Sequence, residues 1–165
     1  MKNLYIKSAR KILQNKDELE KKLKVKIIVK GQNTSITSIS DNGVDEYFAE
    51  RVLLALDYPF LIDDALLLLN EDYLFEAIHI KDFTKRHDLK IIKGRIIGTE
   101  GKTLRVIQDL SNSLIAVKDN DVAIIAQSND FENARQAVIS LIKGSKQANV
   151  YSYLEKSGKR ERKGY

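Results

Sequence analysis

The stretch Ile96-Ile97-Gly98-Thr99-Glu100-Gly101-Lys102-Thr103-Leu104-Arg105-Val106-Ile107 decides the fold of this chain. Two glycines lie three positions apart, apolar residues precede the first, and Leu104 and Ile107 follow at helical spacing. The pattern predicts a helix, a tight glycine turn and a second helix, because glycine tolerates positive φ and lets another backbone approach closely. Helix starts carry unpaired N–H groups and a partial positive charge, which attract phosphate. We therefore expect four amides to point outward there: those of Thr99, Glu100, Gly101 and Lys102.

The glycine pair alone is weak evidence, because glycines at this spacing also occur in ordinary loops between packed helices. The wider pattern Ile-Gly-x-x-Gly-x-x-Leu-x-x-Ile is much more specific. It is the signature of the KH domain, in which this loop clamps the backbone of about four single-stranded nucleotides. A motif of this kind is a hypothesis that needs structural context from the rest of the chain.

The composition is that of a globular protein of one medium or two small domains. The chain has 165 residues, of which 43% are hydrophobic and 31% are charged. It has no cysteine, which excludes disulfides and thiolate metal sites. The first residues lack the apolar segment of a secretory signal, and no apolar run is long enough to span a membrane, so we expect a cytoplasmic protein without membrane contact.

Charge is distributed unevenly along the chain, although the net value is only +5. Residues 1–40 hold ten basic and three acidic residues, whereas residues 41–80 hold one basic and ten acidic residues. Residues 81–118, which contain the glycine loop, are again basic, with nine against four. A basic surface attracts polyanions. Each block taken alone is equally consistent with an ordinary solvated face.

The second half of the chain predicts a small α+β domain. Residues 73–83 are expected to form a strand, followed by the helix before the glycine loop and the helix from Lys102 to about Leu110. Two strands at 114–117 and 122–126 then join at Asp119-Asn120, and a helix from about Phe131 to Ile142 ends at Gly144. This order favours an antiparallel sheet with helices on one face. A short final helix is expected at 151–156, before a mobile basic segment.

The first half repeats part of this pattern. We expect strands at 2–7, 25–29 and 35–40, and helical segments within 8–23, 44–56 and 62–69. Sliding this half forward by 88 positions places Ile36 on Ile124 and Ala49 on Ala137 with matching element order, which favours duplication. The same slide places Arg10 opposite Gly98 and Leu13 opposite Gly101, and no glycine precedes Gly31. The first copy is therefore expected to lack a phosphate-binding loop.

We thus predict an α+β chain of two tandem type I KH-like domains, each a three-stranded antiparallel sheet with helices on one face. Residues 1–72 form a degenerate KH-like domain with a connecting helix. Residues 73–156 form the KH domain with the glycine loop, and residues 157–165 form a basic flexible tail.

Residues 76–156 resemble a family, the tandem-KH ribosome-assembly factors known as partner of Nob, and the archaeal members are nearest in length. The resemblance rests on Gly94-Arg95-Ile96-Ile97-Gly98-x-x-Gly101-Lys102-Thr103 and on the closing pattern from Arg135 to Gly144. It implies binding of single-stranded RNA near the 3′ end of the precursor small-subunit ribosomal RNA, with the Nob endonuclease as a partner. Archaeal relatives are also linked to the alpha subunit of translation initiation factor two. Two features depart from the family: the first half has no glycine loop, and Glu100 stands where a basic residue is common.

The predicted binding mode needs no catalysis, cofactor or metal. Loop amides and basic side chains would hold phosphates, while unstacked bases would lie in a groove and meet the backbone of the adjacent strand. For Ile97 and Ile107, ordinary core packing is an equally good interpretation. The predicted RNA-binding residues are Lys93, Gly94, Arg95, Ile96, Ile97, Gly98, Thr99, Glu100, Gly101, Lys102, Arg105, Ile107, Leu114 and Ile115; Ile96, Ile97, Ile107, Leu114 and Ile115 would wall the groove.

Two other classes of function remain open at this point. A metal-dependent nuclease could use clustered carboxylates such as Asp63-Asp64, Glu71-Asp72 and Glu76, although adjacent acids at a helix start are common as caps. The histidines His79 and His87 lack a convincing ligand set. A protein–protein adaptor without RNA, or a general RNA-binding regulator without a ribosomal role, is also compatible with the acidic block and the degenerate first half.

Overall fold

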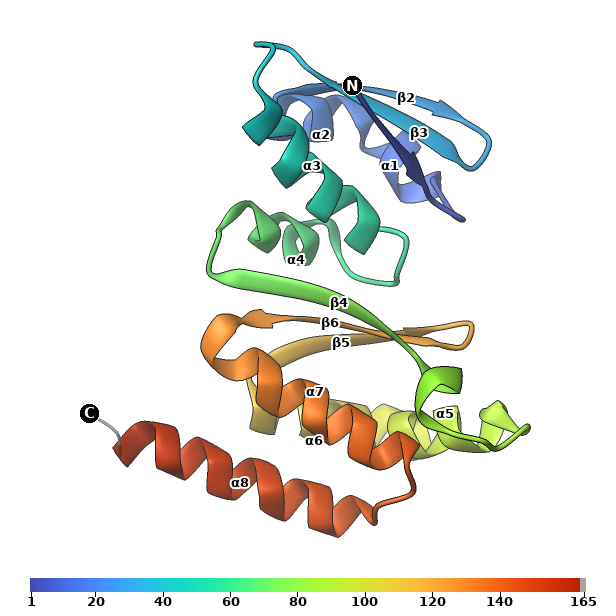
Figure 1. Cartoon of the computed structure of the whole chain (residues 1–165), viewed down its shortest axis with the longest axis vertical. Helices are drawn as coiled ribbons and strands as arrows, with labels where there is room; N and C mark the ends of the chain where they lie inside the picture. Colours follow the sequence, from blue (N-terminus) through green and yellow to red (C-terminus); the bar gives the residue numbers. More distant parts are fainter. Residues whose placement is uncertain (164–165) are drawn as a thin grey trace. The chain divides into compact units, whose positions relative to one another are not determined.

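The computed structural model describes residues 1–163, with side chains placed as far as Gly158. The chain divides into two compact units, unit 1 at Met1–Glu71 and unit 2 at Asp72–Tyr165. Figure 1 shows the elements of both units, which are described separately below. Within the described residues, no helix has the length and apolar character needed to cross a membrane.

Unit 1 is a three-stranded antiparallel sheet with helices packed on it. The strand order in space is β1-β3-β2. Alternate residues of the strands are buried, as in β2, where Val25 and Ile27 are buried while Lys26 and Ile28 are exposed. The elements are β1 (Lys2–Tyr5), α1 (Arg10–Gln14), α2 (Lys16–Leu23), β2 (Val25–Lys30), β3 (Asn33–Ser38), α3 (Gly43–Ala55), α4 (Ile62–Leu66) and the short 3-10 turn η1 (Leu67–Leu69).

Local chemistry accounts for the main helix of this unit. The Asn42 side chain accepts a hydrogen bond from the Val44 amide at 3.0 Å and caps the start of α3. Asp45 and Glu46 lie in the first turn, where the helix dipole favours negative charge. The Glu46 carboxylate also accepts from the Ser38 amide at 3.0 Å, and this bond lowers the pKa of Glu46. Helix α3 is thereby tied to the end of β3.

Unit 2 has the same type of sheet, with strand order β4-β6-β5 and antiparallel pairing throughout. Helices α5, α6 and α7 cover one face of this sheet, and α8 packs against α6 and α7 (Figure 1). The elements are β4 (Tyr73–His79), the 3-10 turn η2 (Ile80–Phe83), α5 (Leu89–Ile97), the 3-10 turn η3 (Thr99–Gly101), α6 (Lys102–Ser111), β5 (Ser113–Lys118), β6 (Asp121–Gln127), α7 (Ser128–Ile142) and α8 (Gln147–Lys163).

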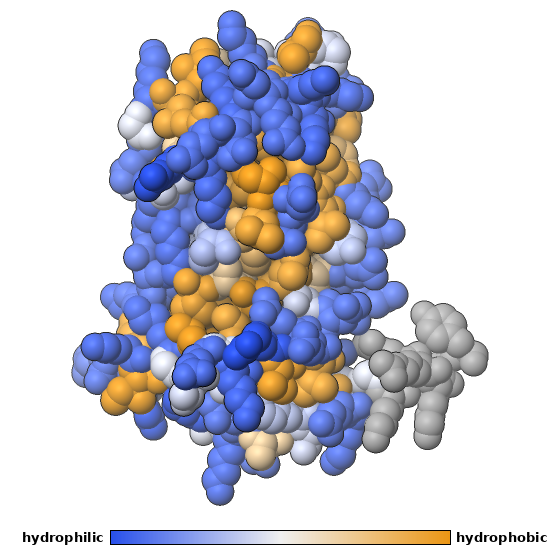
Figure 2. All heavy atoms as spheres, turned by 180° about the vertical axis from the view of Figure 1, so that it is seen from behind, coloured by the Kyte–Doolittle hydropathy of each residue, from blue (hydrophilic) through white to orange (hydrophobic). Residues whose placement is uncertain are grey.

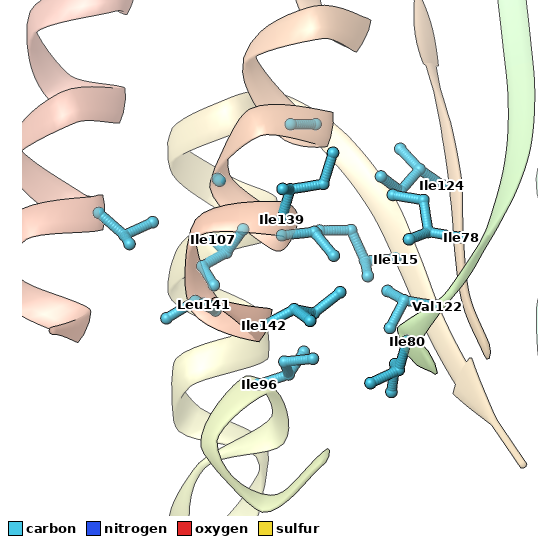
Figure 3. Close-up of a cluster of buried hydrophobic side chains, with 14 of the residues drawn as sticks. Ile78, Ile80, Ile96, Ile107, Ile115, Val122, Ile124, Ile139, Leu141 and Ile142 are labelled. Carbon is cyan, nitrogen blue, oxygen red and sulfur yellow. The ribbon is translucent and has the colours of Figure 1, made fainter. Parts of the chain in front are cut away.

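The core of unit 2 lies between the sheet and these helices. Ile78 and Ile124 point from the strands toward Ile139 of α7, as Figure 3 shows. Ile96 from α5 and Ile107 from α6 join the same cluster. The two helices that flank the glycine loop are therefore fixed by the core, which in turn fixes the ends of the loop. The α+β fold with two three-stranded antiparallel sheets is confirmed.

The pairing registers of the two sheets are equivalent. Ile27 pairs with Ile36 in unit 1, and Ile115, which lies 88 positions after Ile27, pairs with Ile124 in unit 2. The first strands do not follow the same shift, because Lys2 pairs with Ile36 while Glu76, only 74 positions after Lys2, pairs with Ile124. Unit 2 therefore has additional residues between its first strand and its second helix.

Because of these additional residues, the ungapped comparison of the two halves at a shift of 88 positions is wrong for the part of unit 1 before residue 16. Arg10 and Leu13 lie inside α1 and are not the counterparts of Gly98 and Gly101. Helix α1 ends at Gln14 and α2 begins at Lys16, so Asn15 alone stands between them. Unit 1 thus has a single-residue junction where unit 2 has the whole glycine turn.

Two element ends also differ from the expectation. Strand β4 stops at His79, and Ile80–Phe83 form a 3-10 turn in place of the predicted continuation of the strand. Helix α8 runs from Gln147 to Lys163, so the final helix is longer than the predicted 151–156 and replaces most of the predicted tail. Its burial explains the start, since Val150 and Leu154, one turn apart, are only 3% and 1% exposed. Residues 164–165 lie outside the described residues.

The surface carries scattered large apolar side chains among polar ones. Figure 2 shows one face of the molecule, where apolar side chains gather in several patches among the hydrophilic ones. Apolar atoms make up a large share of the surface of ordinary globular proteins. The large hydrophobic residues that are exposed include Tyr5, Leu13, Ile28, Ile39, Val44, Tyr47, Leu61, Ile91 and Tyr153.

Candidate nucleic-acid interface

The glycine turn between α5 and α6 has an unusual backbone. Gly98 has φ 74° and ψ 176°, and Gly101 has φ 74°. Glu100, between them, also has a positive φ of 55°. A Cβ atom on Gly98 would lie 2.2 Å from Thr103 Oγ1 and 2.7 Å from the Thr103 amide nitrogen, so no larger residue fits there. A Cβ atom on Gly101 would meet nothing within 4 Å, and that glycine is required only by its φ angle.

Part of the turn's hydrogen-bonding capacity is used internally. The Gly98 amide donates to the Gly94 carbonyl at 2.8 Å and closes α5. The Gly101 amide donates to the Gly98 carbonyl at 3.2 Å, and the Lys102 amide donates to the Thr99 carbonyl. The prediction of four outward amides is therefore wrong for Gly101 and Lys102. Thr99 and Glu100, both exposed at the tip of the turn, remain the candidates for holding a phosphate.

The basic side chains around the turn fall into two groups. Lys102 and Arg105 are exposed and Lys93 is half-buried. Arg105 also donates from Nη2 to the Glu100 carbonyl at 3.1 Å, which braces the turn. Arg95 faces the other way: its guanidinium donates to the carbonyls of Leu141 in α7 and of Ser145, which follows the end of that helix. Its assignment as a phosphate contact is corrected, because these bonds use it to fix α5 to α7.

One helical turn before Gly98, the backbone of helix α5 is uncovered at Gly94. Gly94 is exposed, and a Cβ atom built on it would have no neighbour within 4 Å. Packing within the protein therefore does not require glycine at this position. Glycine in a helix interior costs about 1 kcal/mol relative to alanine. A ligand that approaches the α5 backbone would explain why glycine is tolerated there.

The proposed groove walls need correction. Ile96 and Ile107 are 0% exposed, and Ile115 is 5% exposed, because all three pack in the core between sheet and helices (Figure 3). Their side chains offer no surface to a base. Ile97 is only half-buried and remains available on the surface beside the turn. Leu114 is also half-buried, but it pairs with Ile125 and so points to the sheet face away from the helices, which makes its assignment as a groove wall wrong. For Ile107 the core interpretation is the correct one.

The strand beside the turn is an edge strand, since β5 pairs only with β6. Bases are expected to meet the backbone of this strand, but its Ile115 amide already donates to a side chain. Gln108 of α6 accepts a hydrogen bond from this amide through Oε1 at 2.8 Å. A base that reads this part of the strand edge must displace the Gln108 side chain.

Gln147, at the start of α8, is a residue that sequence reasoning missed. Its Nε2 donates to the Arg95 carbonyl at 3.0 Å and to Thr103 Oγ1 at 3.1 Å. Arg95 and Thr103 lie on opposite sides of the glycine turn, so one amide group bridges both flanks. Gln147 follows them by 52 and 44 positions, and no local motif points to it.

The residues considered for a nuclease do not assemble into a metal site. In the part of the chain that the structure describes, no group of three or more His, Cys, Asp or Glu side chains is arranged to hold a metal ion. His79 Nδ1 lies 2.6 Å from Asp121 Oδ1 on the neighbouring strand. Glu76 forms an ion pair with Arg135 at 2.9 Å. Asp63 and Asp64 lie in the first turn of α4, where the dipole favours them.

Comparison with known proteins identifies the type of domain in unit 2. Residues 74–159 match the family described as eukaryotic type KH-domain (KH-domain type I), specifically the second KH domain of PNO1. The order of strands and helices in unit 2 agrees with this match.

Relatives with solved structures cover almost the whole chain. Dim2p from Pyrococcus horikoshii OT3 is 32% identical, with a TM-score of 0.85 over 94% of this chain and 98% of that chain. A chain in the a/eIF2alpha–aDim2p–rRNA complex from the same organism is 31% identical, with a TM-score of 0.88 over 96% of this chain and 94% of that one.

The pre-rRNA-processing protein PNO1 of Candida albicans is 30% identical over 172 residues, which include 100% of this chain. The chain spans 60% of the length of that curated relative.

Proposed function

Because the chain belongs to the PNO1 and Dim2 family of KH-domain proteins, we propose that unit 2 binds single-stranded RNA through its glycine turn. The observation that carries this proposal is the combination of Gly94 and Gly98, which lie one helical turn apart. Gly98 is required by packing against Thr103, whereas Gly94 is exposed and not required by any neighbour. A ligand backbone lying along α5 and the turn accounts for the second glycine.

The electrostatics of the turn support a phosphate as the ligand. Lys102 and Arg105 are exposed beside it, and Lys93 lies on the preceding helix. The tip amides of Thr99 and Glu100 lie at the start of α6, where the helix dipole also favours an anion. KH domains hold the backbone of about four nucleotides in this way and read the unstacked bases separately.

The ribosomal role is the second part of the proposal. PNO1 is a pre-rRNA-processing protein, and aDim2p forms a complex with rRNA and the alpha subunit of initiation factor two. By analogy, we infer that this chain acts as a small-subunit ribosome-assembly factor in the cytoplasm. It would bind near the 3′ end of the precursor small-subunit rRNA, with the initiation-factor alpha subunit and a Nob-type endonuclease as partners. Its contribution would be binding without catalysis.

The variant Gly94→Ala tests the loop assignment without disturbing the fold. Alanine has open space there and should stabilise α5 by about 1 kcal/mol. If RNA lies against this backbone, the affinity for a single-stranded RNA from the 3′ end of the small-subunit rRNA should nevertheless fall about tenfold or more. Fluorescence anisotropy with thermal unfolding of the same samples measures both effects.

A matched control is Gly158→Ala, which makes the same change within helix α8, also with no neighbour within 4 Å of the new Cβ. This variant should keep the wild-type affinity. Equal RNA affinity of the wild-type protein and Gly94→Ala would refute the binding mode. Equal affinity for a scrambled strand would remove the ribosomal part and favour a general RNA-binding regulator.

A further inference from the structure

The outer face of the unit 1 sheet differs sharply from that of unit 2, although the two sheets share one register. Equivalent positions lie 88 residues apart in β2 and β3 and in β5 and β6. In unit 2 this face is apolar and buried: Ala123 is 0% and Ile125 is 1% exposed. The equivalent residues of unit 1 are Ser35, which is half-buried, and Thr37, which is exposed. Unit 1 therefore has an open, polar sheet face that unit 2 lacks.

The charge on this open face is entirely of one sign. None of the strands β1, β2 and β3 contains an acidic residue, and Lys26 and Lys30 are both exposed on β2. The acidic residues of unit 1 lie on its helices and connections, as Glu18 and Glu50 do. A surface with lysines and no carboxylates attracts polyanions.

The face also carries an exposed aromatic ring held in a fixed position. Tyr5 on β1 is 59% exposed, and its hydroxyl donates to Gln32 Oε1 in the β2–β3 turn at 2.7 Å. Tyr5 pairs with Asn33 on β3, and Asn33 pairs with Lys30 on β2. The ring and the lysine thus end one cross-strand row, roughly 10 Å apart at the ordinary strand spacing.

We propose that this sheet face is a second binding surface for single-stranded RNA. Tyr5 stacks against a base, Lys26 and Lys30 contact phosphates, and the uncharged side chains of Asn33, Ser35 and Thr37 lie on β3 between the two outer strands. Aromatic rings beside a positively charged groove are the usual platform for single strands. The face has only Ile28 and Tyr5 as large apolar groups, whereas a protein partner requires a larger apolar centre.

This inference extends the proposed function, but it concerns a different unit and is tested separately. The full chain, labelled with nitrogen-15, is titrated with an oligouridine of roughly ten nucleotides, within the usual site size. The amide resonances of Asn3, Tyr5, Lys30 and Asn33 should shift, in addition to those of the glycine turn. Shifts of the turn alone would overturn this inference and leave the proposed function intact. Shifts of the sheet alone would contradict the proposed function and support this inference.

Variants then establish which side chains are used. The double variant Lys26→Gln/Lys30→Gln should lower the salt slope of sheet-face binding by about 1.4, because two phosphate contacts are lost. The control Arg10→Gln/Lys21→Gln removes the same charge from exposed helical positions of unit 1 and should leave the slope unchanged. Equal effects of the two double variants would overturn the proposal, since nonspecific attraction would then explain the binding.

The ring is tested in the same titration. Tyr5→Leu should weaken sheet-face binding about fivefold or more through loss of stacking, whereas Tyr5→Phe, which keeps the ring and loses only the bond to Gln32, should bind nearly as well as the wild type. Oligoglutamate serves as an acidic peptide probe. If it shifts the sheet resonances and oligouridine does not, the face binds an acidic protein and the proposal is wrong.

Discussion

At the scale of single residues, Glu100 is the position of the glycine turn with a strained backbone. It adopts a φ of 55° without being glycine, and such a conformation costs an ordinary residue roughly 1–2 kcal/mol. It also brings a negative charge to the tip that we propose for phosphate. Backbone strain of this kind is often retained at functional sites. The Arg105 bond to its carbonyl compensates part of the strain without involving its side chain.

Two substitutions at Glu100 separate the strain from the charge. Glu100→Gly should raise the free energy of unfolding by about 1 kcal/mol, whereas Glu100→Gln should leave it within about 0.5 kcal/mol. Both should tighten RNA binding at low salt by removing repulsion, and the gain should shrink as salt is raised. Urea unfolding and RNA titrations at two salt concentrations measure these effects. Weaker binding by Glu100→Gln would mean that the carboxylate itself contacts the ligand.

At the scale of elements, α8 acts as a brace for the binding loop. It packs against α6 and α7, and Gln147 at its start bonds to both flanks of the glycine turn. Arg95 strengthens the same junction from the α5 side through the carbonyls of Leu141 and Ser145. The turn is therefore held by segments that follow it by more than forty positions. Such preorganisation lowers the entropic cost of binding.

Removing the Gln147 amide should loosen this brace. Gln147→Ala loses two partly buried hydrogen bonds and should lower the free energy of unfolding by about 1–2 kcal/mol. Hydrogen exchange at Gly101 and Lys102, whose amides are bonded within the turn, should become faster, and RNA affinity should fall. The control Gln136→Ala breaks only an exposed contact to Glu132 in α7 and should change none of these quantities. Unaltered loop exchange in Gln147→Ala would show that α8 does not position the turn.

At the scale of the whole molecule, repeated local patterns were predictable and long-range contacts were not. The alignment of Ile36 with Ile124 anticipated the shared sheet register, because strand pattern and turn length fix pairing. The same slide failed at Asn15, because a difference in length before it cannot be seen in an ungapped comparison. Spacing around the glycines located the turn and the helices on either side of it.

The errors in the site have a common physical origin. An isoleucine beside a glycine loop can face the groove or the core, and only the tertiary packing of α5 and α6 decides that Ile96 and Ile107 are buried. The partners of Arg95 and Gln147 likewise depend on where α7 ends and α8 begins. The sequence predicts too short a helix α8, because Gly158 and the basic residues after it are typical of a mobile tail. The start of the helix is set by tertiary packing, since Val150 and Leu154 are buried.

The central claim, that the glycine turn of unit 2 holds single-stranded RNA, is tested most directly by mapping crosslinks on the protein. A single strand from the 3′ region of the small-subunit rRNA, with photoreactive uridines, is bound to the full chain, irradiated and digested, and the crosslinked peptides are identified by mass spectrometry. We predict crosslinks to the segment that joins α5, the turn and α6, residues 93–105. Crosslinks confined to the acidic helices α3 and α4 of unit 1, with none in residues 93–105, would contradict the account.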